Sequence, residues 1–409
     1  MRIAFLNPSG QIGGAEACLL DAIAALRKVR PEWRILVILG EEGPLASRTA
    51  DLGSEVHLLP FPTELARLGD SGQGGAALLS RLVSTAPTAL RYRFQLRALL
   101  GRLKPDVIHT NGFKMHILGA LTKPLGTALV WHIHDYISSR TVMARLMRRL
   151  ASQTDVIITN SESVADDTRT VLGSASKIVP ILNVVDLEEF KPTGHALDLD
   201  QLSGLSASAE GTIRVGLLST LAWWKGHRLF LEGLARLDPA LPCRGYYIGG
   251  ALYKTQSQES LTELREFAAQ LRLGDRIGFT DVVSEPGAAM RALDMVVHTS
   301  TEPEPFGRVI VEAMACGKPV ITTGLGGAAE ILSLGDFALT INPNQPETLA
   351  SAITSLAADP ALRQRLGSNG LSTARQHFGR ERLARELPPV YEEVLTKIHG
   401  TEFTHAARA

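Results

Sequence analysis

The chain has 409 residues, long enough for two or more domains, and its 42 Lys and Arg balance 42 Asp and Glu. A net charge of zero excludes a protein that binds nucleic acid through its overall charge, so any attraction of anions must be local. The three cysteines, Cys18, Cys243 and Cys316, lie far apart within apolar runs and lack the spacing of metal ligands. Buried, reduced thiols and a reducing cytoplasm fit this pattern.

The first part of the chain alternates short β-rich runs with helical ones. It begins with MRIAFLNPSG, which lacks the apolar segment of a signal peptide, and no apolar run approaches the ~20 residues that span a bilayer. We therefore expect a cytoplasmic protein. The predicted elements are a helix at Ala15–Arg27 and strands at Arg2–Leu6, Arg34–Leu39, Val107–His109, Ala128–His132 and Val156–Thr159. This alternation is typical of a doubly wound parallel sheet.

The alternation stops at Asn183–Asp200, which has no clear period and carries Pro and charged residues. It resumes with predicted strands at Ile213–Leu218, Arg244–Ile248, Arg276–Phe279, Met295–His298 and Val320–Thr322. We therefore predict an α/β protein with two similar domains, residues 1–185 and 186–385, and a final helical segment, residues 386–409. Ligands of such sheets bind at the carboxyl ends of the strands, so we expect a cleft there.

Two glycine-rich loops follow predicted strands. Gly13 and Gly14 precede the first helix, where a backbone without side chains can approach a ligand closely. A turn that simply needs glycine is an equally open interpretation. The spacing is not G-x-G-x-x-G, which argues against a dinucleotide-binding domain. Gly327 lies in a similar loop after Val320–Thr322, with the same two interpretations.

Polar side chains also follow the predicted strands. His109 and Asn111 stand at the end of one strand, and His134 and Asp135 stand just past the next, where side chains emerge toward a cleft. A lone histidine there is more often structural. Lys225 lies in a strand-to-helix loop, where an ammonium group can neutralise a diphosphate, although a solvated surface lysine is the default interpretation.

The most informative stretch is EPFGRVIVEAMACGKPV, residues 304–320, with Glu304 and Glu312 placed around a helix start. Pro305 disfavours helix at Glu304, whereas the residues from Arg308 onward favour it. Glu304 should lie on the preceding loop and Glu312 about one turn inside the helix. The two carboxylates then cannot share a proton and are suited to hold two ends of one elongated ligand.

The same helix start provides donors between the two carboxylates. The backbone N–H groups of Phe306, Gly307 and Arg308 begin the helix, where they lack intrahelical partners and favour an anionic or oxygen-rich ligand. A folded nucleotide sugar has this shape. A glycosidase needs two carboxyl groups flanking one bond, and Glu304 and Glu312 are not expected to do so.

The setting E-P-F-G-R-V-x-x-E-A-M-A-C-G-K-P-V resembles the signature of the retaining glycosyltransferases of family 4. A bare E-x7-E occurs by chance, but this flanking match is long, and the resemblance covers the chain from Gly13 to about Glu330. It implies the GT-B architecture, two Rossmann-like domains facing a cleft, with a last helix that returns to the first domain. It also implies transfer of a sugar from a nucleotide diphosphate sugar to a hydroxyl acceptor, without a metal or other cofactor, in polysaccharide biosynthesis or a related process.

The resemblance implies roles for the matching residues. Glu304 would bind the sugar hydroxyls, Glu312 the ribose, and Lys225 the departing diphosphate, while His134 would reach the anomeric centre. The implied catalytic residues are His134, Glu304 and Lys225, and the implied donor-binding residues are Gly13, Gly14, Phe306, Gly307, Arg308, Glu312 and Gly327. His109, Asn111 and Asp135 would line the cleft or bind the acceptor, which is a glycan, a lipid-linked glycan or a small molecule.

The chain departs from the family pattern at two positions. The loop before Lys225 usually reads G-R-L-x-x-x-K-G, but Thr220 occupies the arginine position, which removes one of two phosphate cations; Arg308 is a candidate substitute. The hinge usually reads N-G-V-D, but here Val184 replaces the glycine and disfavours a positive φ. Asp198-Leu199-Asp200, the one local D-x-D, falls in the linker, and we interpret it as surface charge instead of a metal site.

Two further stretches carry expectations. The run Arg380–Ile398 has a helical pattern, and Pro388 and Pro389 within it predict a kink. Basic stripes at Arg91, Arg93 and Arg97 and at Arg140, Arg145, Arg148 and Arg149 alternate with leucine and methionine. Such stripes are either solvated helix faces over a core or a surface that docks on an anionic membrane, where lipid-linked acceptors lie.

Two other functions remain open from the sequence. A nucleotide-sugar isomerase of the same fold would need an extra acid/base pair near the sugar, and no residue pattern marks one. A non-catalytic sugar-nucleotide-binding scaffold is favoured by Thr220 alone, because the loss of a diphosphate cation weakens leaving-group departure.

Overall fold

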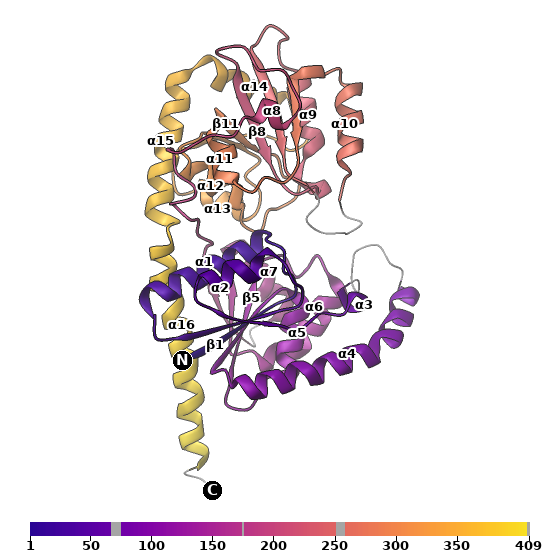
Figure 1. The fold of residues 1–409 in the computed structure, drawn as a ribbon, viewed down its shortest axis with the longest axis vertical. Helices are drawn as coiled ribbons and strands as arrows, with labels where there is room; N and C mark the ends of the chain where they lie inside the picture. Colours follow the sequence, from indigo (N-terminus) through magenta and orange to yellow (C-terminus); the bar gives the residue numbers. More distant parts are fainter. Residues whose placement is uncertain (67–74, 174–175, 251–257, 407–409) are drawn as a thin grey trace. The chain divides into compact units, whose positions relative to one another are not determined.

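The computed structural model describes residues 1–66, 75–173, 176–250 and 258–406. The chain forms two compact units (Figure 1). Unit 1 combines residues 1–183 with the C-terminal residues from 380 onward, and unit 2 holds residues 184–379. Both are α/β units built on a parallel sheet, so the predicted fold class is confirmed.

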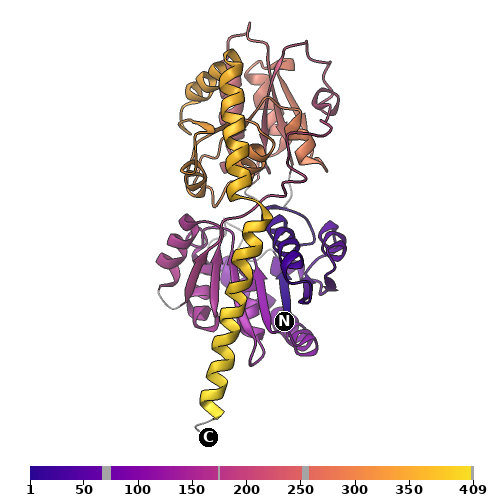
Figure 2. The same ribbon diagram turned by 90° about the vertical axis from the view of Figure 1, so that its left-hand side faces the viewer.

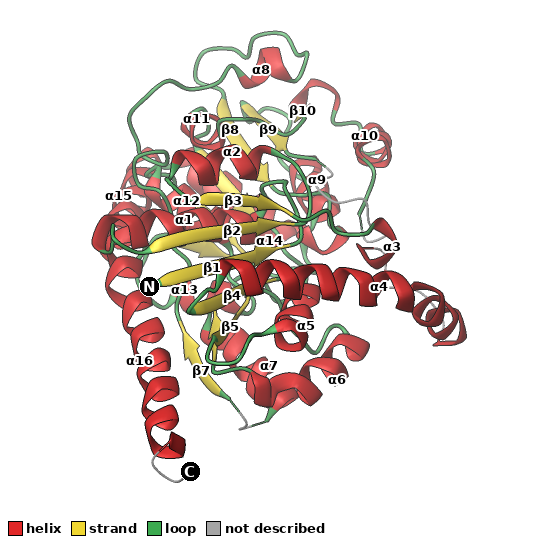
Figure 3. Ribbon diagram, turned by 60° about the horizontal axis from the view of Figure 1, so that its bottom comes forward, coloured by secondary structure: helices red, strands yellow, loops and turns green. Residues whose placement is uncertain are grey.

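Unit 1 contains a seven-stranded sheet in the order β3-β2-β1-β4-β5-β6-β7, all parallel, and Figure 3 shows its strands side by side. The strands are β1 (Arg2–Asn7), β2 (Arg34–Leu39), β3 (Glu55–Leu58), β4 (Val107–Asn111), β5 (Ala128–Ile133), β6 (Val156–Thr159) and β7 (Lys177–Pro180). The helices are α1 (Gly14–Val29), α2 (Pro44–Asp51), α3 (Thr63–Ala66), α4 (Gly75–Leu103), α5 (Phe113–Thr122), α6 (Thr141–Leu150), η1 (Ala151–Gln153), α7 (Glu162–Leu172) and α16 (Arg380–Ala406).

The central strands of unit 1 are buried on both faces, which explains their continuous apolar sequences. Alternate side chains such as Leu6 and Trp131 pack on α4, α5 and α7 in one core. The side chains between them point to the other face, where Phe5 contacts His109 and His109 contacts Tyr391 of α16.

Helix α16 returns from unit 2 to unit 1, as the family resemblance implied, and lies along α1 and β5 (Figure 2). Its first residue, Arg380, donates to the buried Asp21 of α1 at 2.8 Å. Unit 1 resumes at Arg380, six residues before the predicted boundary at 386, and the first unit ends at Asn183 instead of 185. One helix runs through Pro388 and Pro389, so the prolines do not interrupt it.

Unit 2 contains a six-stranded parallel sheet in the order β10-β9-β8-β11-β12-β13. The strands are β8 (Ile213–Leu218), β9 (Cys243–Ile248), β10 (Ile277–Thr280), β11 (Met295–His298), β12 (Val320–Thr322) and β13 (Ala338–Thr340). The helices are α8 (Leu199–Leu202), η2 (Trp223–Lys225), α9 (His227–Ala235), α10 (Leu261–Gln270), η3 (Gly274–Arg276), α11 (Pro286–Arg291), α12 (Arg308–Ala315), α13 (Gly327–Leu332), α14 (Pro346–Ala358) and α15 (Pro360–His377). Its core joins the strands to α9, α10 and α14.

The linker residues correct one prediction and agree with another. Asp200 is 3% exposed instead of forming surface charge, because it accepts hydrogen bonds from Arg244 at 2.6 Å and Tyr246 at 2.5 Å. Asp198 caps α8 by accepting from the Gln201 N–H. At the hinge, Val184 is buried and is not among the described residues with a positive φ, as its side chain predicts.

Candidate functional site

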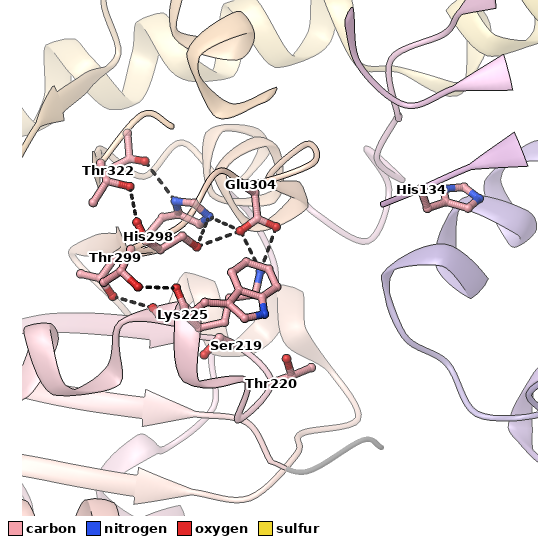
Figure 4. A network of polar contacts seen from close by, with 12 residues as sticks. His134, Ser219, Thr220, Lys225, His298, Thr299, Glu304 and Thr322 are labelled. Atoms are coloured by element: carbon pink, nitrogen blue, oxygen red, sulfur yellow. Dashed lines mark hydrogen bonds and ion pairs between the residues drawn. The ribbon is translucent and has the colours of Figure 1, made fainter. Parts of the chain in front are cut away.

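A buried ion pair lies at the carboxyl end of the unit 2 sheet (Figure 4). Glu304, on the loop between β11 and α12, is 7% exposed. Lys225, on the turn after β8, donates from Nζ to both Glu304 carboxylate oxygens at 2.8 Å. The same ammonium lies 4.1 Å from the centroid of the Trp224 ring, a cation–π contact. Glu304 and Lys225, the two residues of this unit that were predicted to be catalytic, therefore form one ion pair.

Three more polar side chains complete the surroundings of Glu304. His298 Nε2 lies 3.2 Å from Glu304 Oε2, and the Ser300 hydroxyl donates to the same oxygen at 2.8 Å. His298 Nδ1 in turn lies 3.0 Å from Thr322 Oγ1. Burial alone would raise the pKa of Glu304, but the charge of Lys225 and the hydrogen bond from His298 outweigh it, so the pKa is lowered. The carboxylate therefore stays ionised.

The turn that carries Lys225 packs closely against the loop after β11 and is hydrogen-bonded to it. Gly226 has φ +74°, and a Cβ there would lie 1.9 Å from the carbonyl oxygen of Thr299, so this contact requires glycine. Thr299 Oγ1 donates to the Lys225 carbonyl at 3.0 Å, and the Thr301 N–H donates to the Trp224 carbonyl at 2.8 Å. These bonds set the position of the Lys225 side chain.

Helix α12 places Glu312 one turn inside its start, as predicted, with Glu304 on the loop before it. Arg308 Nε donates to Glu312 Oε1 at 3.2 Å, and its Nη1 donates to the Val184 carbonyl at 3.0 Å. Gly307 caps the helix with φ +98°, which favours glycine. The structure thus ties Arg308 to Glu312 and the hinge, and its role as a substitute phosphate cation stays a prediction.

The geometry corrects the predicted donor contact of Gly327 and leaves that of the Phe306 backbone a prediction. The Gly327 N–H already donates to the Glu304 carbonyl at 2.7 Å, so it does not bind a diphosphate in this arrangement. A Cβ at Gly327 would lie 2.3 Å from the Pro305 carbonyl oxygen, which explains the glycine by close packing. The Phe306 side chain is 2% exposed and packs on Phe378, so only its backbone is available for a ligand.

A second polar cluster lies under the Lys225 turn and was not predicted. His227 Nδ1 is 2.7 Å from Glu259 Oε2, and His227 Nε2 is 3.0 Å from the Thr220 carbonyl and 3.1 Å from Ser219 Oγ. Burial would raise the pKa of Glu259, but hydrogen bonds from His227 and Arg228 lower it. The cluster anchors the backbone at Thr220, and no sequence spacing signals it, since Glu259 is 32 residues from His227.

In unit 1, His134 lies just past the end of β5 and is fixed on two sides. Its ring Nε2 is 3.2 Å from Asn111 Oδ1, at the end of β4, and its carbonyl accepts from Asn160 Nδ2 at 3.1 Å. Asn111 is thereby a partner of His134, with an exposed fraction of 1%. The neighbouring Asp135 accepts from the Tyr136 N–H at 2.9 Å and has a half-exposed side chain.

His109 was predicted to line a cleft, and this is wrong. Its exposed fraction is 1%, because α16 covers it: Nδ1 lies 2.8 Å from the Tyr391 hydroxyl and Nε2 lies 3.2 Å from His132 Nδ1. Burial, with a smaller effect from His134, lowers the pKa of His109 to about 3. The ring is therefore neutral and internal.

The glycine loop of unit 1 precedes α1, as predicted. The Gly13 N–H donates to Glu16 Oε2 at 3.1 Å, and Asn7 Nδ2 donates to Glu16 Oε1 at 3.3 Å. Glu16 thus holds the loop between β1 and α1. The N–H of Gly13 is engaged in the fold, and Gly14 is the first residue of the helix.

The described parts of the chain contain neither a cluster of metal ligands nor a membrane-spanning helix. No group of three or more His, Cys, Asp and Glu side chains there has an arrangement that could hold a metal ion. None of the described helices is both long enough and apolar enough to cross a membrane.

Two family models match consecutive parts of the chain. The model described as Glycosyltransferase Family 4 matches residues 12–189, and the model described as Glycosyl transferases group 1 matches residues 204–373. The two matches meet near the boundary between unit 1 and unit 2.

Several curated proteins and solved structures are similar to the chain. A D-inositol 3-phosphate glycosyltransferase of Streptomyces bingchenggensis is 29% identical over 62% of this chain, and the lipopolysaccharide core biosynthesis mannosyltransferase LpsB of Rhizobium meliloti is 29% identical over 53%. The chain spans 57% and 60% of the length of these two relatives. The crystal structure of Anabaena HepE in complex with UDP and glucose is 28% identical, with a TM-score of 0.78, and covers 96% of this chain and 99% of its own.

Proposed function

Since the chain belongs to the glycosyltransferases of family 4, we propose that it moves a sugar from a nucleotide diphosphate sugar to a hydroxyl acceptor, with retention at the anomeric carbon and without a metal. The observation that carries this proposal is the buried Lys225–Glu304 pair at the carboxyl end of the unit 2 sheet. Crystal structures of HepE with UDP and with UDP-glucose support a nucleotide sugar as the donor.

In this proposal, Lys225 and Glu304 bind adjacent parts of the donor. An ammonium group carries three N–H donors, and Lys225 directs two of its contacts at Glu304. The third donates to the diphosphate and stabilises the charge that grows as the sugar leaves. The start of α12 at Gly307 adds backbone donors beside it. Glu304 accepts from the sugar hydroxyls, and Glu312 accepts from the ribose.

His134 is proposed to contact the transferred sugar from unit 1. Its carbonyl is held by Asn160 and its ring by Asn111, so both groups have a fixed position. A fixed group lowers the barrier because its orientation does not have to be found during the reaction. The transition state carries positive charge on the sugar, so the protein acts through position and electrostatics.

A thermal-shift panel of UDP-, GDP- and ADP-sugars tests donor binding. A donor present at 100 times its dissociation constant should stabilise the protein by ~2.7 kcal/mol. The matched controls are the corresponding free sugars, which lack the diphosphate and should give little shift. If no member of the panel shifts the melting temperature, the proposal fails at its first step.

A non-catalytic scaffold is the second candidate, because Thr220 leaves the donor loop without an arginine. A scaffold binds the donor without turning it over. Incubation of the selected donor with candidate acceptors, followed by NMR of the product, separates the two functions. A product with the anomeric configuration of the donor supports the retaining transferase, whereas binding without any product supports the scaffold.

We also propose that unit 1 associates peripherally with an anionic membrane, in order to reach a lipid-linked acceptor. Helices α4 and α6 both contact α5 and both carry exposed arginines beside exposed apolar side chains. The residues are Arg91, Arg97, Leu90 (50% exposed) and Phe94 (66% exposed) on α4 and Arg145, Arg149 and Val142 (36% exposed) on α6. Near an anionic surface each such charge contributes ~1 kcal/mol.

Co-sedimentation with vesicles tests the membrane proposal. Pelleting should require anionic lipid, fall with salt because exposed charges are screened, and weaken in Phe94→Ser. Val282→Ser, which removes an apolar side chain of similar exposure (57%) from unit 2, is the control. Equal pelleting with neutral and anionic vesicles, or none with either, would favour a soluble acceptor.

A further inference from the structure

A line of buried polar rings runs from the C-terminal helix to His134. The Tyr391 hydroxyl of α16 lies 2.8 Å from His109 Nδ1, and His109 Nε2 lies 3.2 Å from His132 Nδ1. The His132 ring then packs on the His134 ring, with the centroids 4.0 Å apart. Tyr391, His109 and His132 are 0%, 1% and 9% exposed. His109 and Tyr391, 282 positions apart in the sequence, thus meet inside unit 1.

The contacts fix where the hydrogens of this line lie. A buried hydroxyl needs an acceptor, and His109 Nδ1 is the acceptor that the described part of the chain offers to Tyr391. If Tyr391 donates, His109 Nδ1 carries the lone pair and His109 Nε2 carries the hydrogen. That hydrogen is donated to His132 Nδ1, so His132 also carries its hydrogen on Nε2. Both rings adopt one tautomer, set by the tyrosine.

The surroundings keep both rings neutral. Burial lowers the pKa of His109 to about 3 and lowers the pKa of His132 well below its ordinary value. Among the residues that the structure describes, the titratable groups that face the pair are His116 of α5, His134 after β5 and Tyr391 of α16. None of these is a carboxylate, so no negative charge favours an imidazolium here. A neutral His132 ring beside His134 does not repel charge that develops there.

We propose that Tyr391 is a positioning residue for sugar transfer: through His109 and His132 it fixes the place and the tautomer of the rings that support His134. The inference rests on the proposed function, in which His134 contacts the transferred sugar. In this proposal helix α16 contributes to the reaction through Tyr391, in addition to packing on α1. The substitution Tyr391→Phe removes only the hydroxyl and leaves the ring contacts with Trp33 and His109.

The tautomers can be measured without any assay of activity. Long-range proton–nitrogen NMR of the full chain labelled with ¹⁵N-histidine distinguishes a ring nitrogen that carries hydrogen from one that does not. We expect the wild-type His109 and His132 both to carry hydrogen on Nε2, and we expect this order to be lost in Tyr391→Phe. Assignment uses His109→Gln, which removes one ring signal. A wild-type His109 with its hydrogen on Nδ1 would overturn the proposal, even if no variant folds.

The kinetic test compares two buried tyrosines of unit 1. With UDP-glucose as the probe donor, Tyr391→Phe should lower kcat about tenfold with little change in the donor KM. It should also move the acid limb of the pH profile upward by ~0.5–1 unit, because His109 Nδ1 becomes able to take a proton. Tyr92→Phe is the control: Tyr92 is 1% exposed, and its hydroxyl donates to the Leu59 carbonyl at 3.4 Å.

Three outcomes separate this inference from the proposed function. An acid limb that moves in Tyr391→Phe and not in Tyr92→Phe supports it, whereas identical behaviour of the two variants returns Tyr391 to a structural role and overturns it. A changed tautomer with an unchanged rate also overturns it, because the line would then not reach the reacting sugar. If the wild type binds no nucleotide sugar, the proposed function fails while the tautomer result still stands.

Discussion

Glu304 and Asp200 are two buried carboxylates at opposite ends of the unit 2 sheet. Both remain ionised, because hydrogen bonds and cationic partners lower the pKa of each against the effect of burial. Asp200 faces Arg214 and Arg244, the second residues of β8 and β9, near the amino ends of these strands. Glu304 faces Lys225, which follows β8 at its carboxyl end.

The difference between the two lies in their partners. Asp200 is held by two arginines, Tyr246 and both the N–H and hydroxyl of Ser208, and these donors use the roughly four lone-pair sites of a carboxylate. Arginine forks are rigid, whereas the Lys225 ammonium is a compact charge on a flexible stem that can be shared with a ligand. Buried charge alone therefore does not distinguish the two carboxylates; the end of the sheet and the type of cation do.

The largest effect is expected from Lys225→Met, which removes the ion pair with Glu304 at the carboxyl end of the unit 2 sheet. It should cost about 2–4 kcal/mol of transition-state stabilisation, since in the proposed function the Lys225 ammonium faces the leaving diphosphate. It should also lower the free energy of unfolding by about 3–5 kcal/mol, because it leaves the Glu304 carboxylate buried without its cation. Single-turnover kinetics and urea unfolding measure the two losses.

The control for Lys225 is another part-buried lysine of unit 2. Lys318 donates to the carbonyls of Arg291 and Leu293 at 3.0 and 2.6 Å, before the amino ends of β11 and β12, whereas the Glu304 network lies at the carboxyl ends. Lys318→Met should destabilise the protein but leave turnover per folded molecule unchanged. Equal kinetic losses in both variants would mean that Lys225 acts through folding alone.

At the amino end of the unit 2 sheet, Asp200→Asn should have the next largest effect. It should lower the free energy of unfolding by about 3 kcal/mol, the lower end for a broken buried pair, since Arg214 is partly exposed. Nucleotide affinity should not change. Asp198→Asn is the matched control and should be nearly neutral, because asparagine caps a helix as well as aspartate. A loss of nucleotide binding in Asp200→Asn would remove the distinction between the two carboxylates.

Thr220→Arg tests whether the loop that carries Lys225 lacks a second cation for the diphosphate. Because Arg308 is bound to Glu312 and the Val184 carbonyl, we expect the added arginine to raise kcat by roughly fivefold, about 1 kcal/mol. Steady-state kinetics with the donor selected by the panel gives the answer. A silent Thr220→Arg together with an Arg308→Ala as harmful as Lys225→Met would instead identify Arg308 as the second phosphate cation.

A smaller effect is expected from pH, through the carboxyl group of Glu304. The folded-state pKa of Glu304 lies below its ordinary value of 4.5, so the folded state binds the proton less tightly than the unfolded one. Its stabilising contribution is complete above pH 4.5 and is lost as the pH falls below it. Urea unfolding of the wild type and Glu304→Gln should therefore converge toward acid pH. A difference in unfolding free energy between the two proteins that grows on acidification would mean that the folded state raises the pKa of Glu304 instead of lowering it.

The central strands could be predicted because their burial makes their sequences continuously apolar. Strands β2, β6, β8, β11 and β12 match the predicted bounds, whereas the edge strands β3, β7 and β13 were missed. The edge strands β3 and β13 contain no fully buried residue, so no apolar run marks them, whereas the edge strand β10 is buried throughout and was predicted.

The local geometry of the candidate site could be predicted where one short motif carries it, and contacts between distant segments were missed. Glu304 and Glu312 follow from the local helix start. The pairing of Lys225 with Glu304 spans 79 positions, and that of His109 with Tyr391 spans 282, so neither is visible in sequence spacing. Asp200 was misread for the same reason, because its arginines lie on strands further along the chain.

Calorimetric titration of a free nucleoside diphosphate, UDP first and then GDP and ADP, tests whether the carboxyl end of the unit 2 sheet binds the donor. In the proposed function Glu312 contacts the nucleotide and Glu304 contacts the sugar. We predict that Glu312→Gln lowers the affinity about tenfold, the loss of one charge-assisted hydrogen bond, while Glu304→Gln binds like the wild type and loses turnover. Equal losses of nucleotide affinity in the two variants would contradict the account.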